Sequence, residues 1–346
     1  MIDARTFARK LLLGGAAWSG TSKLAEPFLS GAGGILMLHR ISRTDHSPLG
    51  INRHLTVDPR FLDRLLADMK RRGMAVVSMD ELVDNLASGR ARRLFAVTAD
   101  DGWLDNLTEA LPVFEAHDVP FTVYVAPGLV TGAVEPWWEV VEAFVAARNV
   151  VRLPAPDGEV ELRCPDAASK RAAVTRIFWH LMNEIAEQDQ QAFLHEMGTL
   201  PAHAARRFMN WDEIRRLATH PLATIGAHTV HHYNLKRLAR ETALSEMQQS
   251  AAIIGHETGT RPRHFAYPYG FAAAAGQREV ELASEAGFAS AVTTRHGVLR
   301  RDHANHLHAL PRISVNGNFQ RLSYMRPLLS GLMTPLANRG RRFVTV

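Results

Sequence analysis

Short apolar runs alternate with amphipathic segments over most of the chain. An aspartate-proline pair, Asp58-Pro59, starts the first amphipathic segment, because aspartate suits a helix N-cap and proline the first helical position. Four apolar runs in the first part of the chain predict buried strands, at 35–38, 75–77, 94–98 and 120–125. Strands and helices in this alternating order, with short connections, favour a parallel sheet surrounded by helices.

The alternation stops between about 136 and 210. Two short strands on either side of Pro156-Asp157-Gly158 predict a hairpin, and helical patterns occupy roughly 167–198. We interpret this stretch as an insertion on the main domain. Trp137 and Trp138 open a helix there, and they could either line a sugar site or pack the insertion down. After the insertion, four further strands are expected near 223–227, 265–267, 289–293 and 306–313.

Both ends of the chain lie outside this alternation, and each carries several basic residues. We expect residues 1–34 to form a basic lead-in with a short surface helix and a flexible glycine segment, Gly31 to Gly34. Residues 316–346 are expected to form a helical extension with a basic tail. The apolar run after Arg9-Lys10 is short and glycine-rich, so it resembles a signal peptide only in part. We therefore expect a cytoplasmic protein, with export by an atypical signal as the alternative.

Composition and charge exclude some classes of partner. The 346 residues carry a formal net charge of +5, to which both ends contribute. These termini could simply be solvated, or they could make peripheral contact with an anionic membrane surface. Basic and aromatic residues do not interleave, so we expect no nucleic-acid partner. The single cysteine, Cys164, cannot form an internal disulfide.

The apolar run 94–98 ends in two adjacent carboxylates, Asp100 and Asp101, followed by Gly102. Carboxyl ends of strands are where α/β enzymes place their chemistry. Neighbouring strand residues point to opposite sides, so the two carboxylates should have different roles, one as a metal ligand and one as a base. The alternative is that the acids only cap the next helix.

A second polar cluster, His228-Thr229-Val230-His231-His232, follows the strand at 223–227. His228 and His232 are four residues apart, and they can converge on one metal if the segment turns helically. Together with Asp101 they make a set of two histidines and one carboxylate, which is typical of a catalytic metal site. The loop Tyr267-Pro268-Tyr269-Gly270 could hold backbone N–H groups for an oxyanion, or it could be an ordinary turn.

These segments together resemble the polysaccharide deacetylase family, which includes chitooligosaccharide deacetylases and carbohydrate esterases like nodulation protein B. The resemblance covers roughly residues 35–315. It rests on the order and spacing of Thr98-Ala99-Asp100-Asp101-Gly102, His228-Thr229-Val230-His231-His232 and Phe265-Ala266-Tyr267-Pro268-Tyr269-Gly270. Leu38-His39 and Leu310-Pro311-Arg312-Ile313 resemble one branch of the family. The resemblance implies an α/β fold, a distorted barrel of about seven strands with helices, and metal-dependent removal of N-acetyl groups from amino sugars.

The resemblance also implies roles for individual residues. Asp101, His228 and His232 would hold a divalent metal, expected to be zinc, and Asp100 would take a proton from the metal-bound water. The backbone N–H of Tyr269 would help to stabilise the oxyanion. His39 would be the general acid, with His308 as the alternative because other branches supply the acid from near the C-terminal end.

One departure from the family pattern leads to a further prediction. Ala266 stands where many members have an arginine that pairs with the base. We expect Arg312 to take over this pairing with Asp100, because arginine makes bidentate contacts to carboxylates.

The expected substrate is an acetylated oligo- or polysaccharide, which could be lipid-linked. Two alternatives use the same residues. One is a metal-dependent hydrolase of another amide or of an O-acetyl ester. The other is a catalytically inactive carbohydrate-binding protein.

Overall fold

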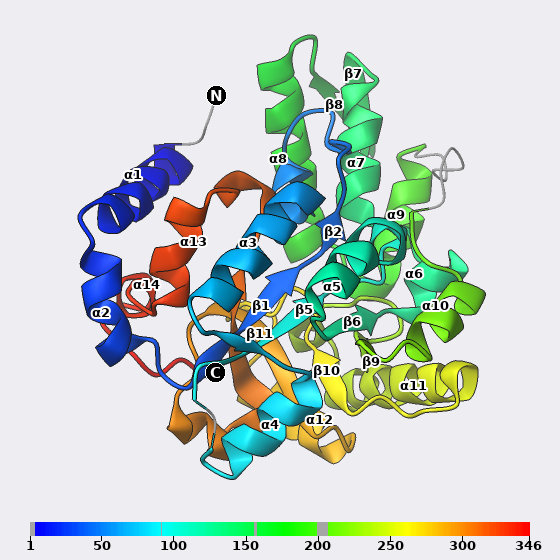
Figure 1. Ribbon diagram of the computed structural model, residues 1–346. Helices are drawn as coiled ribbons and strands as arrows, with labels where there is room; N and C mark the ends of the chain where they lie inside the picture. Colours follow the sequence, from blue (N-terminus) through cyan, green and yellow to red (C-terminus); the bar gives the residue numbers. More distant parts are fainter. Residues whose placement is uncertain (1–3, 91, 156–157, 199–206) are drawn as a thin grey trace.

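A barrel of seven parallel strands forms the centre of the computed structural model, which describes residues 4–90, 92–155, 158–198 and 207–346 (Figure 1). β1 pairs with β12 on one side and with β5 on the other, and this second pairing closes the ring. The predicted seven-stranded barrel is therefore confirmed. In order around the ring, its strands are β1 (Gly33–Leu38), β12 (Leu310–Ser314), β11 (Ser290–His296), β10 (His264–Ala266), β9 (Ala223–Ala227), β6 (Phe121–Val125) and β5 (Leu94–Ala99).

Besides the hairpin described below, three short strands of the described residues lie outside the ring. β4 (Ala75–Val76) pairs with the start of β5. β2 (Arg40–Ile41) and β3 (Thr56–Val57) pair with each other in the connection that leaves β1. This connection carries several residues of the site described below.

Helices cover the outside of the barrel because each presents one apolar face. In α3 (Pro59–Arg71), the Asp58 side chain accepts a hydrogen bond from the Arg60 N–H, as expected for an N-cap. Further helices are α5 (Leu111–His117), α10 (Trp211–Ala218), α11 (Arg240–Thr258) and α12 (Gln277–Glu285). α4 (Met79–Ala87) packs its buried face against the barrel interior at the amino ends of the strands. The opposite ends of the strands remain available for a site.

The elements between β6 and β9, apart from α10, share an apolar core of their own. β7 (Val150–Ala155) and β8 (Gly158–Arg163) pair antiparallel, as predicted; the expected turn residues Pro156 and Asp157 lie outside the described residues. The remaining elements are α6 (Pro127–Thr131), α7 (Trp137–Ala146), α8 (Ala167–Asn183) and α9 (Gln190–Glu196). Figure 1 shows α7, α8 and the hairpin together at the top of the molecule.

The two chain ends pack against each other beside the barrel. α1 (Ala4–Trp18) lies against α13 (Leu322–Leu329) and buries Leu13, and α2 (Thr21–Leu29) follows it. A last short helix is α14 (Met333–Ala337). None of the helices in the described part of the chain has both the length and the apolar character needed to cross a membrane.

The structure corrects two local predictions and adds detail to a third. Gly33 and Gly34 belong to β1 and are not a flexible lead-in. Gly33 has φ 143°, and a Cβ there would lie 1.7 Å from the Leu94 carbonyl oxygen, so the close approach of β5 requires glycine. Residues 307–309 form a 3₁₀ turn before β12 and not part of a strand. The helix expected through 104–114 is present and contains a π-helical segment at 106–110.

Asp68→Asn tests the contact that holds α13 against α3. Arg326 on α13 donates two hydrogen bonds to Asp68 on α3, at 2.7 and 3.1 Å, and these bonds hold the pKa of Asp68 below its usual value despite burial. We expect the substitution to lower the free energy of unfolding by about 1–2 kcal/mol at neutral pH, a modest value because Arg326 is half exposed.

The effect should depend on pH with a definite sign. A depressed carboxyl pKa stabilises the fold above the unfolded value of about 3.9, and this contribution is lost as the pH falls through the folded value. Urea unfolding at several pH values measures the difference between wild type and variant. A difference that stayed constant from neutral pH to below pH ~3 would contradict the role of the charge.

Candidate active site

A pocket of about 360 Å³ opens at the carboxyl ends of the barrel strands. It brings together every predicted site residue except Arg312, which lies directly behind it, and His308. The pocket is lined by Met37, His39, Asn52, His54, Leu55, Asp100, Asp101, Trp137, Trp138, Phe178, Met182, His228, His232, Tyr269, Phe271, Thr294, Ser314 and Asn316. It is therefore built partly from barrel loops and partly from the elements between β6 and β9.

Asp101, His228 and His232 converge at the base of this pocket. The Nε2 atoms of both histidines lie 3.4 Å from Asp101 Oδ1, and all three side chains are buried. One ligand atom from each residue falls within 4.8 Å of the others. These three residues present two nitrogen donors and one oxygen donor that could hold a metal ion.

Unusual backbone conformations bring these side chains together. The expected helical turn at 228–232 is wrong, because Thr229 and His232 have φ of 60° and 58°. Asp101 has φ 76°, so the alternation of the strand ends at Ala99 and both carboxylates reach the same pocket. Left-handed conformations cost non-glycine residues about 1 kcal/mol or more each. The surrounding structure holds this strain where the side chains have to meet.

The hydrogen bonds around the cluster fit a metal ion. His228 Nδ1 lies 2.7 Å from the Ala266 carbonyl oxygen, and it must donate because a carbonyl only accepts. This contact turns Nε2 of the ring toward Asp101 Oδ1, a buried oxygen without a hydrogen-bond partner. Burial also lowers the pKa of His232, which disfavours its protonated form. Two imidazole nitrogens and a carboxylate oxygen that face one another at this distance fit a cation between them.

Trp103 completes the orientation of Asp101, and the sequence analysis gave it no role. Its indole Nε1–H donates to Asp101 Oδ2 at 2.9 Å, so Oδ1 is the atom that remains for a ligand. The ring stacks on Phe208, and the Arg40 guanidinium lies 4.5 Å from its centroid. The sequence offered one signal for this role, which is that Trp103 stands two residues after the Asp-Asp pair.

Asp100 and Arg312 form a buried bidentate ion pair. The Nη1 and Nη2 atoms of Arg312 each donate to one carboxylate oxygen of Asp100 at 2.7 Å. Arg312 Nη1 also donates to Thr98 Oγ1, and Nε donates to the Thr293 carbonyl. The predicted pairing is therefore present, although Ala266 leaves no arginine in the usual position. Burial raises the pKa of Asp100, but the charge and hydrogen bonds of Arg312 outweigh it and keep the pKa below its ordinary value.

His39 lies beside this ion pair at the end of β1. Its Nε2 is 3.9 Å from Asp100 Oδ2, and its side chain is 23% exposed, so a molecule in the pocket can reach it. Asn106 Nδ2 donates to the His39 carbonyl and fixes this segment. A buried carboxylate and an accessible imidazole thus face the same space.

His308 is placed away from the site. It precedes β12, and so lies at the amino ends of the strands, whereas the pocket is at the carboxyl ends. Its Nε2 donates to the Phe288 carbonyl at 2.7 Å, and Phe288 likewise precedes β11. The alternative assignment of His308 as general acid is therefore wrong.

Tyr269 lines the pocket with its ring 5.0 Å from the ring of His232. Its left-handed backbone, with φ 63°, is fixed by a hydrogen bond from Thr294 Oγ1 to its carbonyl. Its phenolic oxygen accepts from Trp137 Nε1 at 2.9 Å, and burial raises the pKa of the phenol. Within the described residues, no protein hydrogen bond uses the Tyr269 backbone N–H.

α7 contributes to the pocket in two ways. Trp137 and Trp138 line it, and the Trp138 ring lies 4.9 Å from the His232 ring, so the pair both packs and faces the site. On the same helix, buried Glu142 anchors the loop that carries Asn52 and His54. Its carboxylate accepts from Ser47 Oγ, from the N–H groups of Leu49, Ile51 and Asn52, and from Asn52 Nδ2.

A buried ion cluster joins α7 to the barrel below His39. Arg40 donates to Asp105 at 2.9 Å and to Glu139 at 3.0 Å, and Glu139 also accepts from Arg207. Burial raises the pKa of Asp105 to about 6, although the charge of Arg40 and the Ile41 N–H partly offset it. No motif in the sequence indicated these partners, because they lie far apart along the chain.

Glu142→Gln should weaken substrate binding more than it slows chemistry. An amide nitrogen would replace one acceptor oxygen among several N–H donors, and the loop that carries Asn52 and His54 would loosen. Asp100 and the metal-binding residues do not lie on this loop. For the acetylated oligosaccharides that the family resemblance implies as substrates, we expect KM to rise about tenfold, with kcat within a factor of about three, because one charge-assisted hydrogen bond contributes about 1.5–3 kcal/mol.

Steady-state kinetics of acetate release measures both constants. Glu161→Gln, on the exposed strand β8, is the matched control and should leave both constants unchanged. A fall in kcat at unchanged KM would contradict the positioning role of Glu142.

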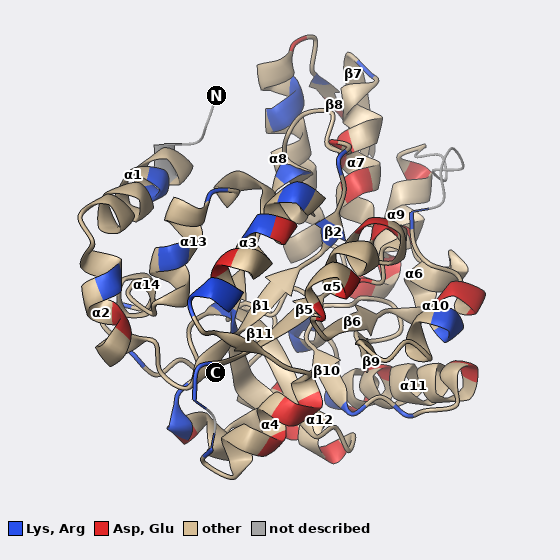
Figure 2. Cartoon of the chain, in the orientation of Figure 1, with Lys and Arg blue, Asp and Glu red and all other residues tan. Residues whose placement is uncertain are grey.

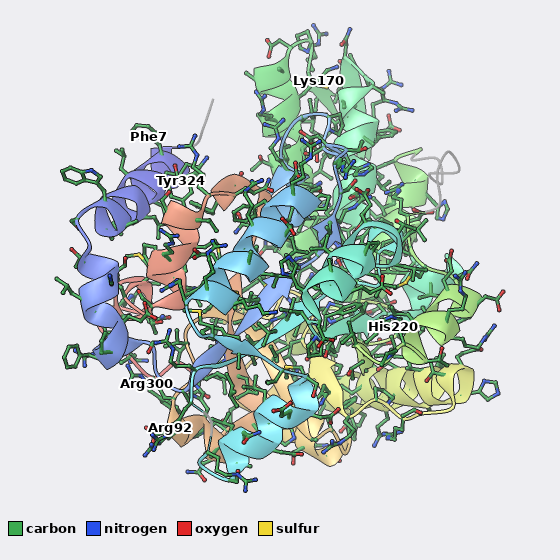
Figure 3. All side chains as sticks on the ribbon, viewed as in Figure 1. Phe7, Arg92, Lys170, His220, Arg300 and Tyr324 are labelled. Carbon is green, nitrogen blue, oxygen red and sulfur yellow. The ribbon has the colours of Figure 1, made fainter. Side chains whose placement is uncertain are left out.

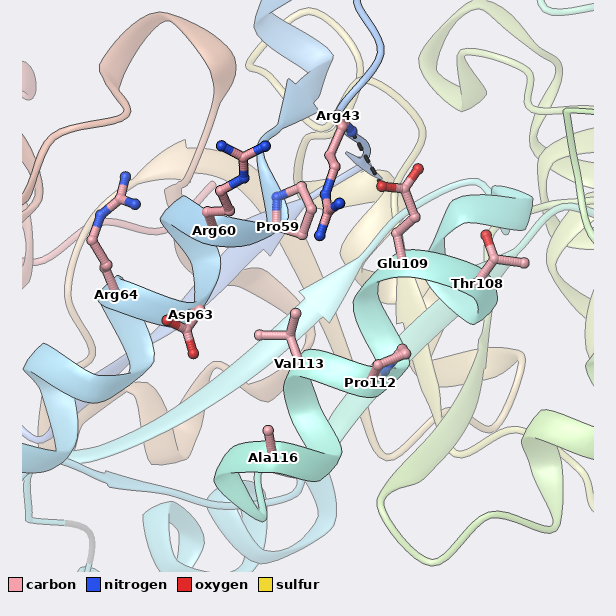
Figure 4. A pocket seen from close by; sticks show the side chains of 10 residues that line it. All are labelled: Arg43, Pro59, Arg60, Asp63, Arg64, Thr108, Glu109, Pro112, Val113 and Ala116. Carbon is pink, nitrogen blue, oxygen red and sulfur yellow. Dashed lines mark hydrogen bonds between the residues drawn. The ribbon is translucent and has the colours of Figure 1, made fainter.

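A second, larger groove of about 540 Å³ lies on the outside of the barrel between α3 and α5 (Figure 4). It is lined by Arg43, Pro59, Arg60, Asp63, Arg64, Thr108, Glu109, Pro112, Val113 and Ala116. Its acids are already paired, Asp63 with His117 and Glu109 with Ser42 and the Arg43 N–H. None of the predicted site residues lies there, so volume alone does not identify the chemistry.

Comparison with known proteins agrees with this geometry. Residues 169–291 match the family model described as polysaccharide deacetylase. The resemblance to the polysaccharide deacetylase family is confirmed. The matched segment contains His228, His232 and Tyr269, whereas Asp100 and Arg312 lie outside it and join the site through the fold. No curated protein matches the sequence significantly.

Solved structures of deacetylases share the fold. The deacetylase PplD of Streptococcus pyogenes, in complex with acetate, is 18% identical with a TM-score of 0.58, and the match covers 86% of this chain and 97% of that chain. IcaB from Ammonifex degensii is 18% identical with a TM-score of 0.54, covering 87% and 98%. The BpsB deacetylase domain from Bordetella bronchiseptica is 18% identical with a TM-score of 0.50, covering 82% and 95%. The family model matches part of the chain, and these solved structures share its barrel fold.

Proposed function

We propose that this protein is a metal-dependent hydrolase that removes N-acetyl groups from amino sugars in an oligo- or polysaccharide. One observation carries the proposal. A cluster suited to a metal ion and a buried carboxylate held ionised by arginine lie in the same pocket. Binding of a carbohydrate alone requires neither group, which argues against a catalytically inactive binding protein.

Asp101, His228 and His232 would hold the divalent metal, and zinc suits two imidazoles and one carboxylate. When bound, such an ion lowers the pKa of a water molecule toward about 7 and polarises a carbonyl oxygen. Trp103 orients the Asp101 side chain, and the Ala266 carbonyl orients the His228 ring. Such outer partners fix the orientation and tautomer of metal-binding residues.

Asp100 is the proposed general base. Arg312 keeps this buried carboxylate ionised and fixes both of its oxygens, so it can accept a proton from the attacking water. The backbone N–H of Tyr269 is the proposed donor to the developing oxyanion.

His39 is the proposed general acid. Amide hydrolysis requires protonation of the leaving amine, and His39 lies 3.9 Å from Asp100 on the open side of the pocket. Base and acid are thus close enough to act on neighbouring atoms of one acetamide group.

The substrate class rests on the lining of the pocket. Trp137, Trp138 and Phe178 give it an aromatic wall next to the polar site, which suits the apolar face of a sugar ring. The glycan could be free or lipid-linked. Cytoplasmic placement remains an expectation from the sequence. An O-acetyl ester or another acetylated amide would use the same residues and is the alternative substrate.

Acetate release from N-acetylglucosamine oligomers tests the proposal. We expect release by the metal-loaded enzyme, loss of activity after chelation, and recovery when zinc is added back. Acetylated esters and amides that are not sugars, assayed in parallel, separate the alternative substrates. Metal binding without acetate release from any glycan would contradict the amino-sugar assignment. Failure to bind any divalent metal would contradict the mechanism.

A further inference from the structure

Large apolar side chains are concentrated on the outer surface of the two N-terminal helices. Ten such side chains are exposed among the described residues, and six of them lie on α1 and α2. The six are Phe7, Leu11, Leu12, Trp18, Leu24 and Phe28. Trp18 is 92% exposed and Phe28 78%, so no part of the described chain covers them.

Helical spacing gathers these residues into faces. Phe7, Leu11 and Trp18 are separated by four and seven residues, and Leu24 and Phe28 by four, so each set lies on one side of its helix. Leu13 points away from this side of α1 and is buried. Figure 3 shows Phe7 at the outer edge of the molecule. We call this exposed surface of α1 and α2 the N-terminal apolar face.

The charges around this face are almost all positive. α1 and α2 carry Arg9, Lys10 and Lys23, and their one acid, Glu26, is buried and paired with Arg72 and Arg93. Figure 2 shows this distribution as blue bands on both helices.

Basic residues from the C-terminal region border the end of α2. The Ala32 N–H donates to the Leu299 carbonyl, and the neighbouring Arg300 donates to the carbonyl of Arg342. The arginines at 300 and 342 therefore lie next to the segment that leaves α2. The exposed apolar side chains of α1 and α2 therefore lie near several cations, while Glu26 is neutralised by its arginine partners.

We propose that the N-terminal apolar face docks on an anionic lipid membrane surface. Exposed Leu, Phe and Trp side chains enter the boundary between headgroups and acyl chains, while neighbouring Lys and Arg contact lipid phosphates. A second copy of this chain is disfavoured as the occupant. A two-fold interface places the same surface on both sides and would bring these cations together.

This inference does not depend on the hydrolase mechanism. It assigns the expected peripheral membrane contact chiefly to apolar side chains of α1 and α2, with the basic residues as the electrostatic part. Docking through these helices leaves the barrel pocket free, because none of its lining residues lies on α1 or α2. It would place a deacetylase next to glycans held at a membrane.

Co-sedimentation with lipid vesicles tests the proposal. The probes are phosphatidylcholine vesicles with and without phosphatidylglycerol. We expect the full chain to bind vesicles that contain phosphatidylglycerol, and the variant Leu11→Gln/Trp18→Gln/Phe28→Gln to bind at least about tenfold more weakly, since burial of each apolar group contributes to membrane affinity. Trp179→Gln is the matched control, because Trp179 is 57% exposed on α8 and lies outside the apolar face. It should bind like the wild type.

Further readouts separate the other outcomes. The three substituted side chains are exposed, so the thermal midpoint and acetate release from soluble oligomers should stay unchanged in the triple variant. Lys23→Gln should weaken binding only to the anionic vesicles. Three results would overturn the proposal: no binding by the wild type, equal binding with and without phosphatidylglycerol, or a dimer in light scattering that the triple variant abolishes. Loss of acetate release alone would contradict the proposed function and not the docking surface.

Discussion

Asp100→Asn is expected to slow acetate release by about 10²–10⁴-fold, the usual contribution of a positioned general base. Asparagine has nearly the same shape, and it can still accept a hydrogen bond from Arg312 through its amide oxygen. It cannot take up a proton, so the attacking water is no longer activated. Asp101, His228 and His232 keep their positions, so metal content should remain at the wild-type level. Kinetics combined with metal analysis of the same preparation measures both quantities.

Asp302→Asn provides the control, because Asp302 is an exposed carboxylate in the turn before β12 and lies outside the pocket. It should be as active as the wild type. Asp100→Asn with wild-type turnover would remove Asp100 from the mechanism. Loss of metal together with activity would instead indicate that Asp100 shapes the metal site.

Arg312→Met should damage both stability and turnover. The substitution leaves the Asp100 carboxylate buried without its partner, and breaking a buried ion pair in this way costs about 3–5 kcal/mol of unfolding free energy. Turnover should fall at least about 100-fold, because Asp100 will favour its protonated form and lose its fixed orientation. Metal content should be retained, since the Arg312 side chain makes no hydrogen bond with Asp101, His228 or His232.

A double variant distinguishes the two effects. Arg312→Met combined with Asp100→Asn removes the unpaired charge, so it should recover part of the lost stability while activity stays as low as in Asp100→Asn alone. Denaturant unfolding and kinetics of the two single variants and the double variant complete the cycle. Additive losses of stability would contradict a direct Asp100–Arg312 interaction, and unchanged turnover in Arg312→Met would exclude Arg312 from the mechanism.

Local sequence patterns predicted much of the fold. The strands at 94–99, 121–125 and 223–227 were expected within one or two residues, and the N-cap of α3 was expected at Asp58. These features depend on neighbours in the chain, such as an apolar run that must be buried or a side chain that caps the next turn. The closure of β1 on β5 was expected only from the family resemblance, because it is a contact between segments about 60 residues apart.

The candidate site likewise has features that the sequence indicates and features that only the structure shows. The sequence by itself indicated the candidate residues, since the Asp100-Asp101 pair and the His228–His232 spacing can be read locally. Only the tertiary structure decided how they meet. Left-handed residues, not a helical turn, bring His232 to Asp101; Arg312 reaches Asp100 from 212 positions away; and His308 lies at the wrong end of the barrel. The roles of Glu142 and Trp103 also became visible only in the structure. A hydrogen bond depends on distance and direction in space, which a linear pattern does not contain.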